Sequence, residues 1–535
     1  MLSYRKLAMR VLGRPLHTEG IDSPRPASQR AAAFVLTAAM LITLAAPAFA
    51  KEWYIEDGNI TVKAGDTKGT NKVSQGESTD VPDTDTVITN REKNASSNTV
   101  TIEAKDKDDK VEVTLKDVNI DTSSRNKAAV SVTGEGDTNI KLDGDNALKS
   151  DIYRSGIYGS GSLTISGGEN DSLTAQGGSG ANGISSSGSL TISGGTITAN
   201  GDDGGRGISS SGSVTISGGS TVTANGGSGT ISGGDGIWSG GGVTISGGST
   251  VTANGGNGGS LVGGDGIRSG GGLTVSDGTV TAKGGNGDSK DGYGGDGIRS
   301  GGVVTISGNT VNAAGGYGGK VGGYGICSFD RVAISGGTVE AAGGNGSTGG
   351  GSGIYSSVID LSGSLELTAK AGSPNGRALS QNGSELELDD IKDKLGPGAK
   401  VTATDANGET KQVSIPRPVE PEESSSSSDG GSAAPSAPAS PLPGLTVTDK
   451  DGQRISYTST QSGNTLTVCV GRLTASLHVS LAALRQLRAE GIETIAFQTI
   501  LCSTSLSVDE LLTMGGEDAE AVLTHRFTDS SLTVG

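Results

Sequence analysis

Short runs of alternating apolar and polar residues recur through the middle of the chain. Leu190-Thr191-Ile192, Val243-Thr244-Ile245 and Val304-Thr305-Ile306 each place an apolar residue on either side of a threonine. A spacing of two residues is that of a β-strand with one buried face, whereas an amphipathic helix needs apolar residues three and four apart. A second run in each repeat, such as Val222-Thr223-Ala224, has the same alternation. The pattern therefore predicts short strands of Val, Ile and Thr, which suit a pleated surface.

A Gly-Ile pair precedes the two runs in each repeat and sets its period. The pairs begin at Gly156, Gly183, Gly207, Gly236, Gly266, Gly297, Gly325 and Gly353, so successive pairs are 27, 24, 29, 30, 31, 28 and 28 residues apart. Such periods are typical of solenoids. With three short strands in each period of 24–31 residues, the sequence predicts an all-β fold, a single-stranded right-handed parallel β-helix. Equivalent strands of neighbouring coils should then pair about 4.8 Å apart.

Composition divides the chain into further segments on both sides of this repeat. Late solenoid strands are predicted at Leu365-Glu366-Leu367 and Leu386-Glu387-Leu388. After a run rich in Pro, Ser and Ala that cannot bury enough surface to order itself, the last segment reads as a small α+β domain. The predicted boundaries are 1–50 for a signal peptide, 51–84 for an N-terminal cap, 85–390 for the solenoid, 391–415 for a C-terminal cap, 416–443 for a disordered linker and 444–535 for the small domain.

Two helices are expected in the small domain. Ser480 can cap a helix with Leu481, Leu484 and Leu487 on one face, which Gly491 would end. Further along, the Ser507 and Glu510 spacing is that of a capping box. The predicted strands of this domain are 445–447, 465–468, 494–497 and 522–524.

The first 50 residues have the pattern of an export signal. Basic residues from Arg5 to Arg30 precede an apolar stretch from Ala31 to Ala46, and Ala48-Phe49-Ala50 is a small-x-small cleavage site. The apolar stretch is shorter than the ~20 residues that span a membrane, which favours cleavage over anchoring. No second apolar span follows, so a transmembrane anchor beyond this segment is not expected. The protein is predicted to be secreted, with association to a cell surface left open.

Composition and charge agree with an extracellular solenoid. Hydrophobic residues make up 32% and aromatic residues 3% of the 535 residues, too few for a globular core of that size but enough for a thin aliphatic one. The formal charge of −17 argues against nucleic-acid partners. Cys469 and Cys502 are a candidate disulfide after export, although spacing alone does not establish the pairing. No Cys/His group has zinc spacing.

Three aspartates occupy the same place in successive repeats. Asp235, Asp265 and Asp296 each precede a Gly-Ile pair, and Arg268 and Arg299 follow the last two pairs. One interpretation is a site for calcium or for a sugar acid. The favoured interpretation is structural, with each carboxylate accepting bonds from nearby backbone N–H groups and the arginines offsetting carboxylate repulsion between coils. These residues follow the repeat register, whereas catalytic groups normally break it, so no cofactor is expected and calcium is only weakly supported.

The residue after each Gly-Ile pair is the better candidate for ligand contact. If the isoleucine is buried, its neighbour faces outward. Aromatic faces can stack on sugar rings and arginine can bond hydroxyl groups, so a contact patch around Trp238 and Arg268 is predicted, although isolated exposed aromatics are ordinary. The outward positions read Tyr158, Ser185, Ser209, Trp238, Arg268, Arg299, Cys327 and Tyr355, of which Tyr158, Trp238, Arg268, Arg299 and Tyr355 are the ligand-contact candidates.

Several stretches together resemble a known family. Val113-Thr114-Leu115-Lys116-Asp117-Val118-Asn119-Ile120, Ile140-Lys141-Leu142-Asp143-Gly144-Asp145-Asn146 and the coils that follow resemble exported proteins of gut-type Gram-positive bacteria that are labelled carbohydrate-binding domain-containing proteins. The resemblance covers roughly 59–376. It implies glycan binding but supplies no residue motif to transfer.

Three functions follow as hypotheses. The first is an exported, non-catalytic β-solenoid that binds carbohydrate, with a glycan or a host or cell-surface molecule as partner. The alternative is a structural or adhesive stalk that presents the C-terminal domain to a protein partner. A polysaccharide lyase or glycoside hydrolase is the third hypothesis. It is the least favoured, because such enzymes need clustered carboxylates for acid and base chemistry, and the candidate aspartates here follow the repeat register as structural residues do. The oligomeric state is left open.

Overall fold

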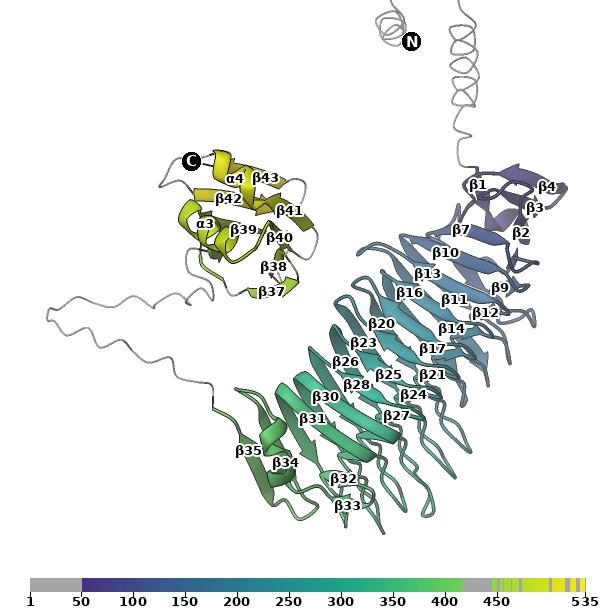
Figure 1. Cartoon of the computed structure of the whole chain (residues 1–535). Helices are drawn as coiled ribbons and strands as arrows, with labels where there is room; N and C mark the ends of the chain where they lie inside the picture. Colours follow the sequence, from purple (N-terminus) through teal and green to yellow (C-terminus); the bar gives the residue numbers. More distant parts are fainter. Residues whose placement is uncertain are drawn as a thin grey trace, which may run out of the picture. The chain divides into compact units, whose positions relative to one another are not determined.

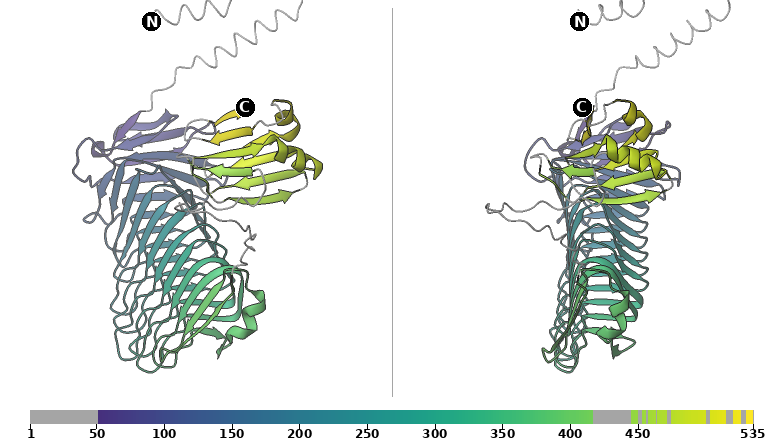
Figure 2. Two further views of the ribbon diagram at one scale, coloured as in Figure 1. Left: turned by 90° about the vertical axis from the view of Figure 1, so that its left-hand side faces the viewer. Right: turned by 60° about the vertical axis from the view of Figure 1, so that its left-hand side comes forward.

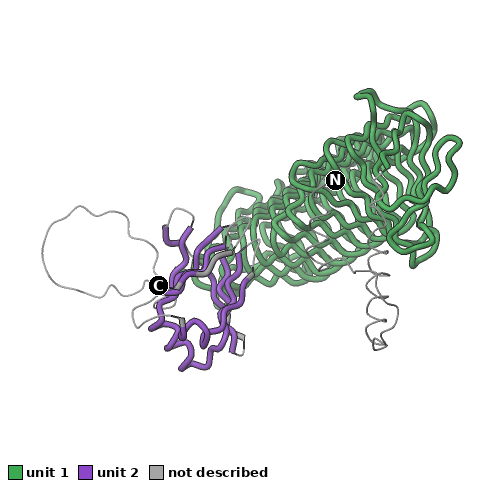
Figure 3. The backbone as a smooth tube through the Cα atoms, turned by 90° about the horizontal axis from the view of Figure 1, so that it is seen from above, with its two compact units in different colours: residues 1–420 green, residues 421–535 purple. Residues whose placement is uncertain are grey.

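A computed structural model describes residues 51–416 and 445–534, the latter with gaps at 450–452, 456, 463, 471–473, 500–502, 515–519 and 526–529. The predicted signal peptide and nearly all of the predicted linker lie outside the described residues. The chain divides into two compact units, Met1–Glu420 and Pro421–Gly535 (Figure 3). Within the described residues, no helix is both long and apolar enough to cross a membrane.

The first unit is a β-solenoid of about 13 turns, as predicted, with its coils stacked along one axis (Figures 1 and 2). Each of the central coils contains three strands, and each strand pairs in parallel with its equivalent in the next coil. The first stack contains the Gly-Ile strands. It comprises β12 (Ile157–Gly159), β15 (Ile184–Ser186), β18 (Ile208–Ser210), β21 (Ile237–Ser239), β24 (Ile267–Ser269) and β27 (Ile298–Ser300).

The second and third stacks contain the two alternating runs of each repeat. The second is β13 (Ser162–Ser166), β16 (Leu190–Ser193), β19 (Val214–Ser217), β22 (Val243–Ile245), β25 (Leu273–Val275) and β28 (Val304–Ile306). The third is β14 (Ser172–Ser179), β17 (Thr196–Asp202), β20 (Thr221–Asn225), β23 (Ser249–Asn254), β26 (Gly278–Lys283) and β29 (Thr310–Ala314). In the next two coils, β30 (Ile326–Ala342) and β31 (Ile354–Lys370) run through all three positions. The handedness of the solenoid stays a prediction.

One aliphatic core runs along the inside of the stack. The isoleucine of every Gly-Ile pair from Ile157 to Ile354 is fully buried, and the register places each one directly beside the next. Alternate residues of the other stacks, such as Val251 and Ala253, are buried in the same core. No coil can bury these residues alone, so stability depends on the interfaces between neighbouring coils.

Parallel pairing extends beyond both predicted solenoid boundaries. The earlier coils contain β5 (Val87–Thr89), β6 (Val100–Glu103), β7 (Lys110–Lys116), β8 (Asn119–Asp121), β9 (Val130–Thr133), β10 (Asp137–Asp143) and β11 (Asp145–Lys149). Within the predicted cap, β1 (Glu52–Tyr54) and β2 (Ile60–Ala64) already pair in parallel with β5 and β6. The cap itself is the 3₁₀ helix η1 (Ile55–Asp57) with β3 (Asn71–Gln75) and β4 (Ser78–Asp83), which pair antiparallel.

The other end of the stack differs from the prediction at one strand. Leu386-Glu387-Leu388 is not a strand, because Leu388 begins the 3₁₀ helix η2 (Leu388–Lys394). Leu388 and Ile391, three residues apart, are buried on one face of this helix while its acidic and basic residues remain outside. The end is completed by β32 (Leu379–Gln381), β33 (Ser384–Glu385), β34 (Lys400–Thr404) and β35 (Thr410–Ser414), of which β34 still pairs in parallel with β31.

Glycine-rich segments project from the stack between the third strand of one coil and the Gly-Ile strand of the next (Figure 1). We call these segments, at 226–235, 255–265, 284–296, 315–324 and 343–352, the glycine arms. Their backbones are hydrogen-bonded in series: Gly256 N donates to Gly234 O and Gly264 N to Gly256 O, both at 2.8 Å. A Cβ atom at either position would overlap the backbone of the neighbouring coil, so the glycine content reflects close approach of backbones.

In its described residues, the second unit contains two four-stranded sheets and two helices. The helix predicted after Ser480 is α3 (Leu481–Ala489), and the Ser480 hydroxyl accepts a bond from Ala483 N at 3.2 Å. The second predicted helix is α4 (Val508–Met514). One sheet contains β36 (Leu445–Thr448), β39 (Ala475–Ser480), β42 (Glu520–His525) and β43 (Ser530–Val534); the other contains β37 (Thr458–Ser462), β38 (Thr465–Cys469), β40 (Thr494–Gln498) and β41 (Ser503–Ser507).

Candidate functional site

The predicted ligand-contact residues lie in one register along the Gly-Ile stack. Trp238 on β21 is the direct neighbour of Arg268 on β24, which is in turn the neighbour of Arg299 on β27. Tyr158 is 44% exposed, Arg268 is exposed, and Trp238, Arg299 and Tyr355 are half-buried. The structure therefore brings Trp238 and the two arginines together, whereas Tyr158 and Tyr355 lie coils away on either side.

One member of this series is not exposed. Cys327, which the alternation predicts to face outward, is 1% exposed. Its register neighbours are Arg299 and Tyr355, two long side chains that cover the small thiol from both sides. Burial, and next the charge of Asp296, raise the pKa of the Cys327 thiol to about 12, so this residue is not a ligand-contact candidate.

Trp238 has a cationic partner that the sequence pattern did not reveal. The Arg206 guanidinium lies over the indole ring, 4.4 Å from its centroid. Arg206 is held there by an ion pair with Asp235, with 3.1 Å between Nε and Oδ2. Arg206 precedes its Gly-Ile pair at the place where later coils have aspartate. This substitution in the series was the sequence signal that could have identified Arg206 as a site residue. The indole is consequently fixed in orientation by a cation–π contact.

Aromatic and cationic side chains also associate further along the same face. Tyr324 and Tyr355 stack with centroids 4.9 Å apart and an interplanar angle of 19°. The Arg299 guanidinium lies 5.2 Å from the ring centroid of Phe329, which is 56% exposed. Tyr355 is thus engaged with a neighbouring ring, which leaves Trp238 and Tyr158 as the aromatic candidates whose faces are not stacked on another aromatic ring among the described residues.

The aspartate series has the structural role that was favoured. Asp235 Oδ1 accepts a bond from Asp265 N at 2.9 Å, Asp265 Oδ1 from Asp296 N at 2.7 Å, and Asp296 Oδ1 from Tyr324 N at 2.7 Å. Asn182 Oδ1 accepts from Arg206 N in the same way at 2.8 Å. Each side chain therefore joins its coil to the next through a backbone N–H group.

Burial makes two of these carboxyl groups weak acids. Desolvation, and next the charges of Asp296 and Asp235, raise the pKa of Asp265 to about 8. Desolvation also raises the pKa of Asp296, to about 6, although the backbone N–H of Tyr324 and the Arg299 guanidinium oppose the rise. Among the described residues, no group of three or more His, Cys, Asp or Glu side chains is arranged to hold a metal ion.

A continuous groove follows this face of the stack beside the glycine arms. It consists of two hollows of about 560 and 660 Å³ that share Gly180 and Asn182 in their walls. We call it the ladder groove. Its charged and aromatic lining residues are Lys127, Tyr153, Arg154, Tyr158, Arg206, Asp235, Asp265, Arg268 and Arg299. Hollows of this size are typical of small-ligand sites, in which a few polar groups fix the orientation of the ligand.

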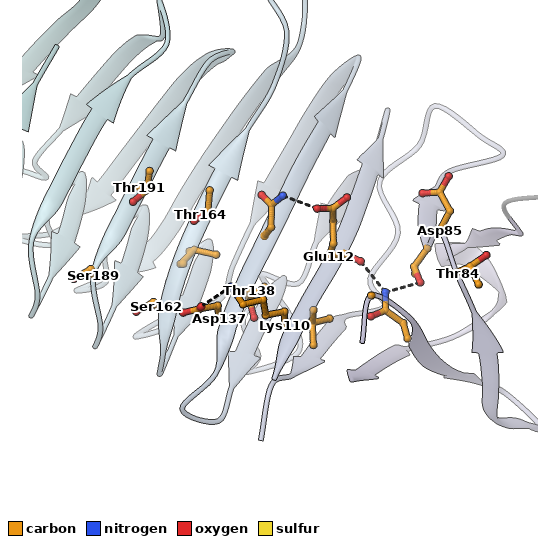
Figure 4. A pocket seen from close by; sticks show the side chains of 16 residues that line it. Thr84, Asp85, Lys110, Glu112, Asp137, Thr138, Ser162, Thr164, Ser189 and Thr191 are labelled. Carbon is orange, nitrogen blue, oxygen red and sulfur yellow. Dashed lines mark hydrogen bonds and ion pairs between the residues drawn. The ribbon is translucent and has the colours of Figure 1, made fainter. Parts of the chain in front are cut away.

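A second cavity of about 610 Å³ lies near the N-terminal end, where no candidate residue was predicted (Figure 4). Its polar groups already bond one another. Asn139 Nδ2 donates to Glu112 Oε2 at 2.9 Å, and Lys110 lies 3.6 Å from Asp137. No aromatic side chain lines it, so we regard the ladder groove as the better binding site.

The glycine arms carry exposed apolar residues that sequence reasoning did not single out. Ile231 is 61% exposed, Leu261 53%, Tyr293 42% and Tyr317 47%. Their occurrence as single bulky residues within glycine-rich segments was the sequence signal that could have predicted their exposure. None of these four side chains lines the ladder groove.

The predicted disulfide cannot be placed, because Cys502 lies outside the described residues. The Cys469 thiol donates to Gln498 Oε1 at 3.3 Å. The pairing of Cys469 with Cys502 stays a prediction.

The fold defines the protein as a β-solenoid with an open groove along one stack of strands. Comparison of the chain with protein-family models, with curated proteins and with solved structures found no match.

Proposed function

We propose that the protein is an exported, non-catalytic β-solenoid that binds carbohydrate in the ladder groove. The observation that carries this proposal is the constellation beside the groove: Arg206 and Arg268 line it, and both adjoin the half-buried indole of Trp238, which lies next to the lining and is fixed by Arg206. An aromatic face supplies apolar contact area for a sugar ring, and arginine donors bond its oxygen atoms. Tyr158 extends the same groove toward the N-terminal coils.

The state of the carboxyl groups supports binding without catalysis. A glycoside hydrolase needs two carboxyl groups placed on either side of the scissile bond. In the aspartate series, one oxygen of each carboxyl group is bonded to a backbone N–H of the next coil. Arg206 and Arg299 hold the second oxygens of Asp235 and Asp296. Asp235 and Asp296 therefore have both carboxyl oxygens engaged, and Asp265 has one engaged in joining its coil to the next.

Export is part of the same proposal. The basic leader, apolar stretch and Ala48-Phe49-Ala50 site in residues 1–50 support it, as does the resemblance to exported carbohydrate-binding domain-containing proteins. An exported protein would meet its ligand outside the cell, as a free glycan or as a molecule of a host or cell surface.

A stalk is the second candidate function, favoured by the length of the solenoid. About 13 turns at a spacing of ~4.8 Å extend over roughly 60 Å. Such a stack would act as a spacer for the second unit, whose residues 444–535 we propose form a small α+β domain. Partner binding that is lost when 445–535 are deleted, but is kept when the ladder groove is altered, would select the stalk.

A glycan array probed with the full chain tests carbohydrate binding. We expect binding to at least one class of plant, mucin or cell-wall glycan, and about a tenfold loss of affinity for Trp238→Ala, which corresponds to about 1.4 kcal/mol. The matched control is Tyr317→Ala, which removes an exposed tyrosine of a glycine arm that is neither in the groove lining nor in the register of Trp238 and Arg268, and this variant should bind as the native chain does. Absence of binding across all three glycan classes, or equal losses for both variants, would contradict the proposal.

A further inference from the structure

The ladder groove carries a local excess of positive charge on an acidic protein. The whole chain has a formal charge of −17. Five cationic side chains nevertheless line the groove: Lys127, Arg154, Arg206, Arg268 and Arg299. A cluster of this kind is unexpected if the groove serves only a neutral ligand, because like charges repel when they share one surface.

The acidic residues of the groove do not cancel this charge. Asp235 is paired with Arg206 at 3.1 Å, and Asp296 with Arg299 at 3.4 Å. Asp265 lies between them, 5% exposed, and has no ion pair among the described residues. Its raised pKa of about 8 keeps it largely protonated at neutral pH. The groove near Trp238 therefore contains three positively charged arginines and two ionised carboxylates, which leaves a net positive charge.

Three groove cations form no ion pair among the described residues: Lys127, Arg154 and Arg268. Of these, Arg268 is the one in register with Trp238, and its side chain is exposed. Its charge acts on Asp296, where it opposes the rise in pKa, but the two groups form no ion pair. Its position is one coil, or about 4.8 Å, from Trp238 on one side and from Arg299 on the other. A sugar chain lying along the solenoid axis would place one ring on the indole while an acidic substituent of the next sugar met Arg268.

We propose that the ladder groove recognises an acidic glycan, through a carboxylate or sulfate group bound by Arg268. The planar guanidinium forms paired hydrogen bonds with such oxyanions, which distinguishes them from hydroxyl groups. Trp238 supplies the contact with the sugar ring. This inference rests on the proposed carbohydrate binding and names the class of carbohydrate.

The test compares an acidic oligosaccharide with its uncharged methyl ester and with a sulfated probe. The full chain is titrated with oligogalacturonate, with its fully methyl-esterified form, and with a sulfated oligosaccharide. We expect the acidic oligomer to bind at least tenfold more tightly than the ester at low salt, and the difference to shrink as ionic strength rises. Preference for the sulfated probe over the uronate would assign sulfate as the recognised group.

Substitution at Arg268 connects the preference to the residue. Arg268→Gln should reduce the affinity for the acidic oligomer about tenfold and bring it close to that of the ester, while Arg268→Lys should retain part of the preference. Arg331→Gln is the control, since Arg331 is an exposed arginine outside the groove lining. Thermal melts of each variant establish that the fold is intact.

The outcomes separate the two proposals. Equal affinity for acid and ester, or a preference that survives Arg268→Gln, would overturn the assignment of an acidic ligand and leave carbohydrate binding in place. Failure of all three probes, together with a silent glycan array, would overturn both.

Discussion

Replacing Gly351 with alanine is expected to destabilise the solenoid by about 3 kcal/mol or more, the upper range for overpacking a tight site. Gly351 is buried in a glycine arm, where its N–H donates to Gly344 O and its carbonyl accepts from Gly372 N, both at 2.8 Å. A Cβ atom there would overlap the carbonyl oxygen of Gly323 in the neighbouring coil. The obstacle is the backbone of Gly322 and Gly323, so no side-chain rotation relieves it.

Gly349, two residues earlier in the same arm, provides the matched control. A Cβ atom at Gly349 would meet only the methyl groups of Val321 at 3.9 Å, an ordinary contact distance. Thermal unfolding followed by circular dichroism should show a melting temperature several degrees lower for Gly351→Ala and nearly unchanged for Gly349→Ala. Equal melting temperatures for the two variants would show that the arms are not packed backbone to backbone.

Replacing Asp265 with asparagine is expected to stabilise the protein in alkaline solution. The pKa of Asp265 is about 8 in the folded protein, against an ordinary value of 3.8. Between these values the unfolded chain is ionised while the folded one keeps its proton, so the native protein loses stability as pH rises from about 4 to about 8. Asparagine has no such penalty, and its amide oxygen can accept from Asp296 N as Asn182 does from Arg206 N.

The effect should therefore depend on pH. We expect Asp265→Asn to exceed the native protein in unfolding free energy by roughly 2–4 kcal/mol at pH 8.5 and by little at pH 4.5. Asp288→Asn, which changes an exposed aspartate of the next glycine arm, should give no comparable difference. Melts of the three proteins at both pH values measure this. A lower stability of Asp265→Asn at pH 8.5 would mean that Asp265 is ionised in the folded state and bound favourably.

The repeating part of the fold could be predicted because each position has one physical requirement in every coil. The buried Gly-Ile isoleucines and the alternation in runs such as Val222-Thr223-Ala224 specify strand type, period and inward face. Parallel pairing of each strand with its equivalent then follows from the period alone. The helix after Ser480 was predictable for a similar reason, since its cap and apolar face are local in sequence.

The ends and the arms were less predictable because their requirements depend on contacts distant in sequence. Leu386-Glu387-Leu388 alternates like a strand, yet the end of the stack needs a cover, and Leu388 with Ile391 provides it from a 3₁₀ helix. The backbone packing of the glycine arms has no side-chain pattern, so composition indicates turns and not the hydrogen-bonded series. Four of the described strands in the second unit were not predicted. β37 and β41 are rich in serine and threonine and lack apolar alternation, whereas β39 and β43 do alternate and were overlooked.

The candidate site was predictable in part. Outward alternation beside the buried isoleucines located Trp238, Arg268 and Arg299 in one register. It misplaced Cys327, whose exposure depends on the size of its neighbours. The contact of Arg206 with Trp238 depends on the path of the segment between β17 and β18, which no local pattern determines.

Hydroxyl-radical footprinting of the full chain, with and without a glycan selected from the array, tests the central claim most directly. Oxidation of exposed aromatic side chains is measured by mass spectrometry. If the ladder groove is the binding site, the glycan will protect Tyr158 in its lining and Trp238 beside it, while Tyr317 on the glycine arm, 47% exposed, is oxidised equally in both states. Protection of Tyr317 and Tyr293 with no change at Trp238 would contradict the account and place the glycan on the arms.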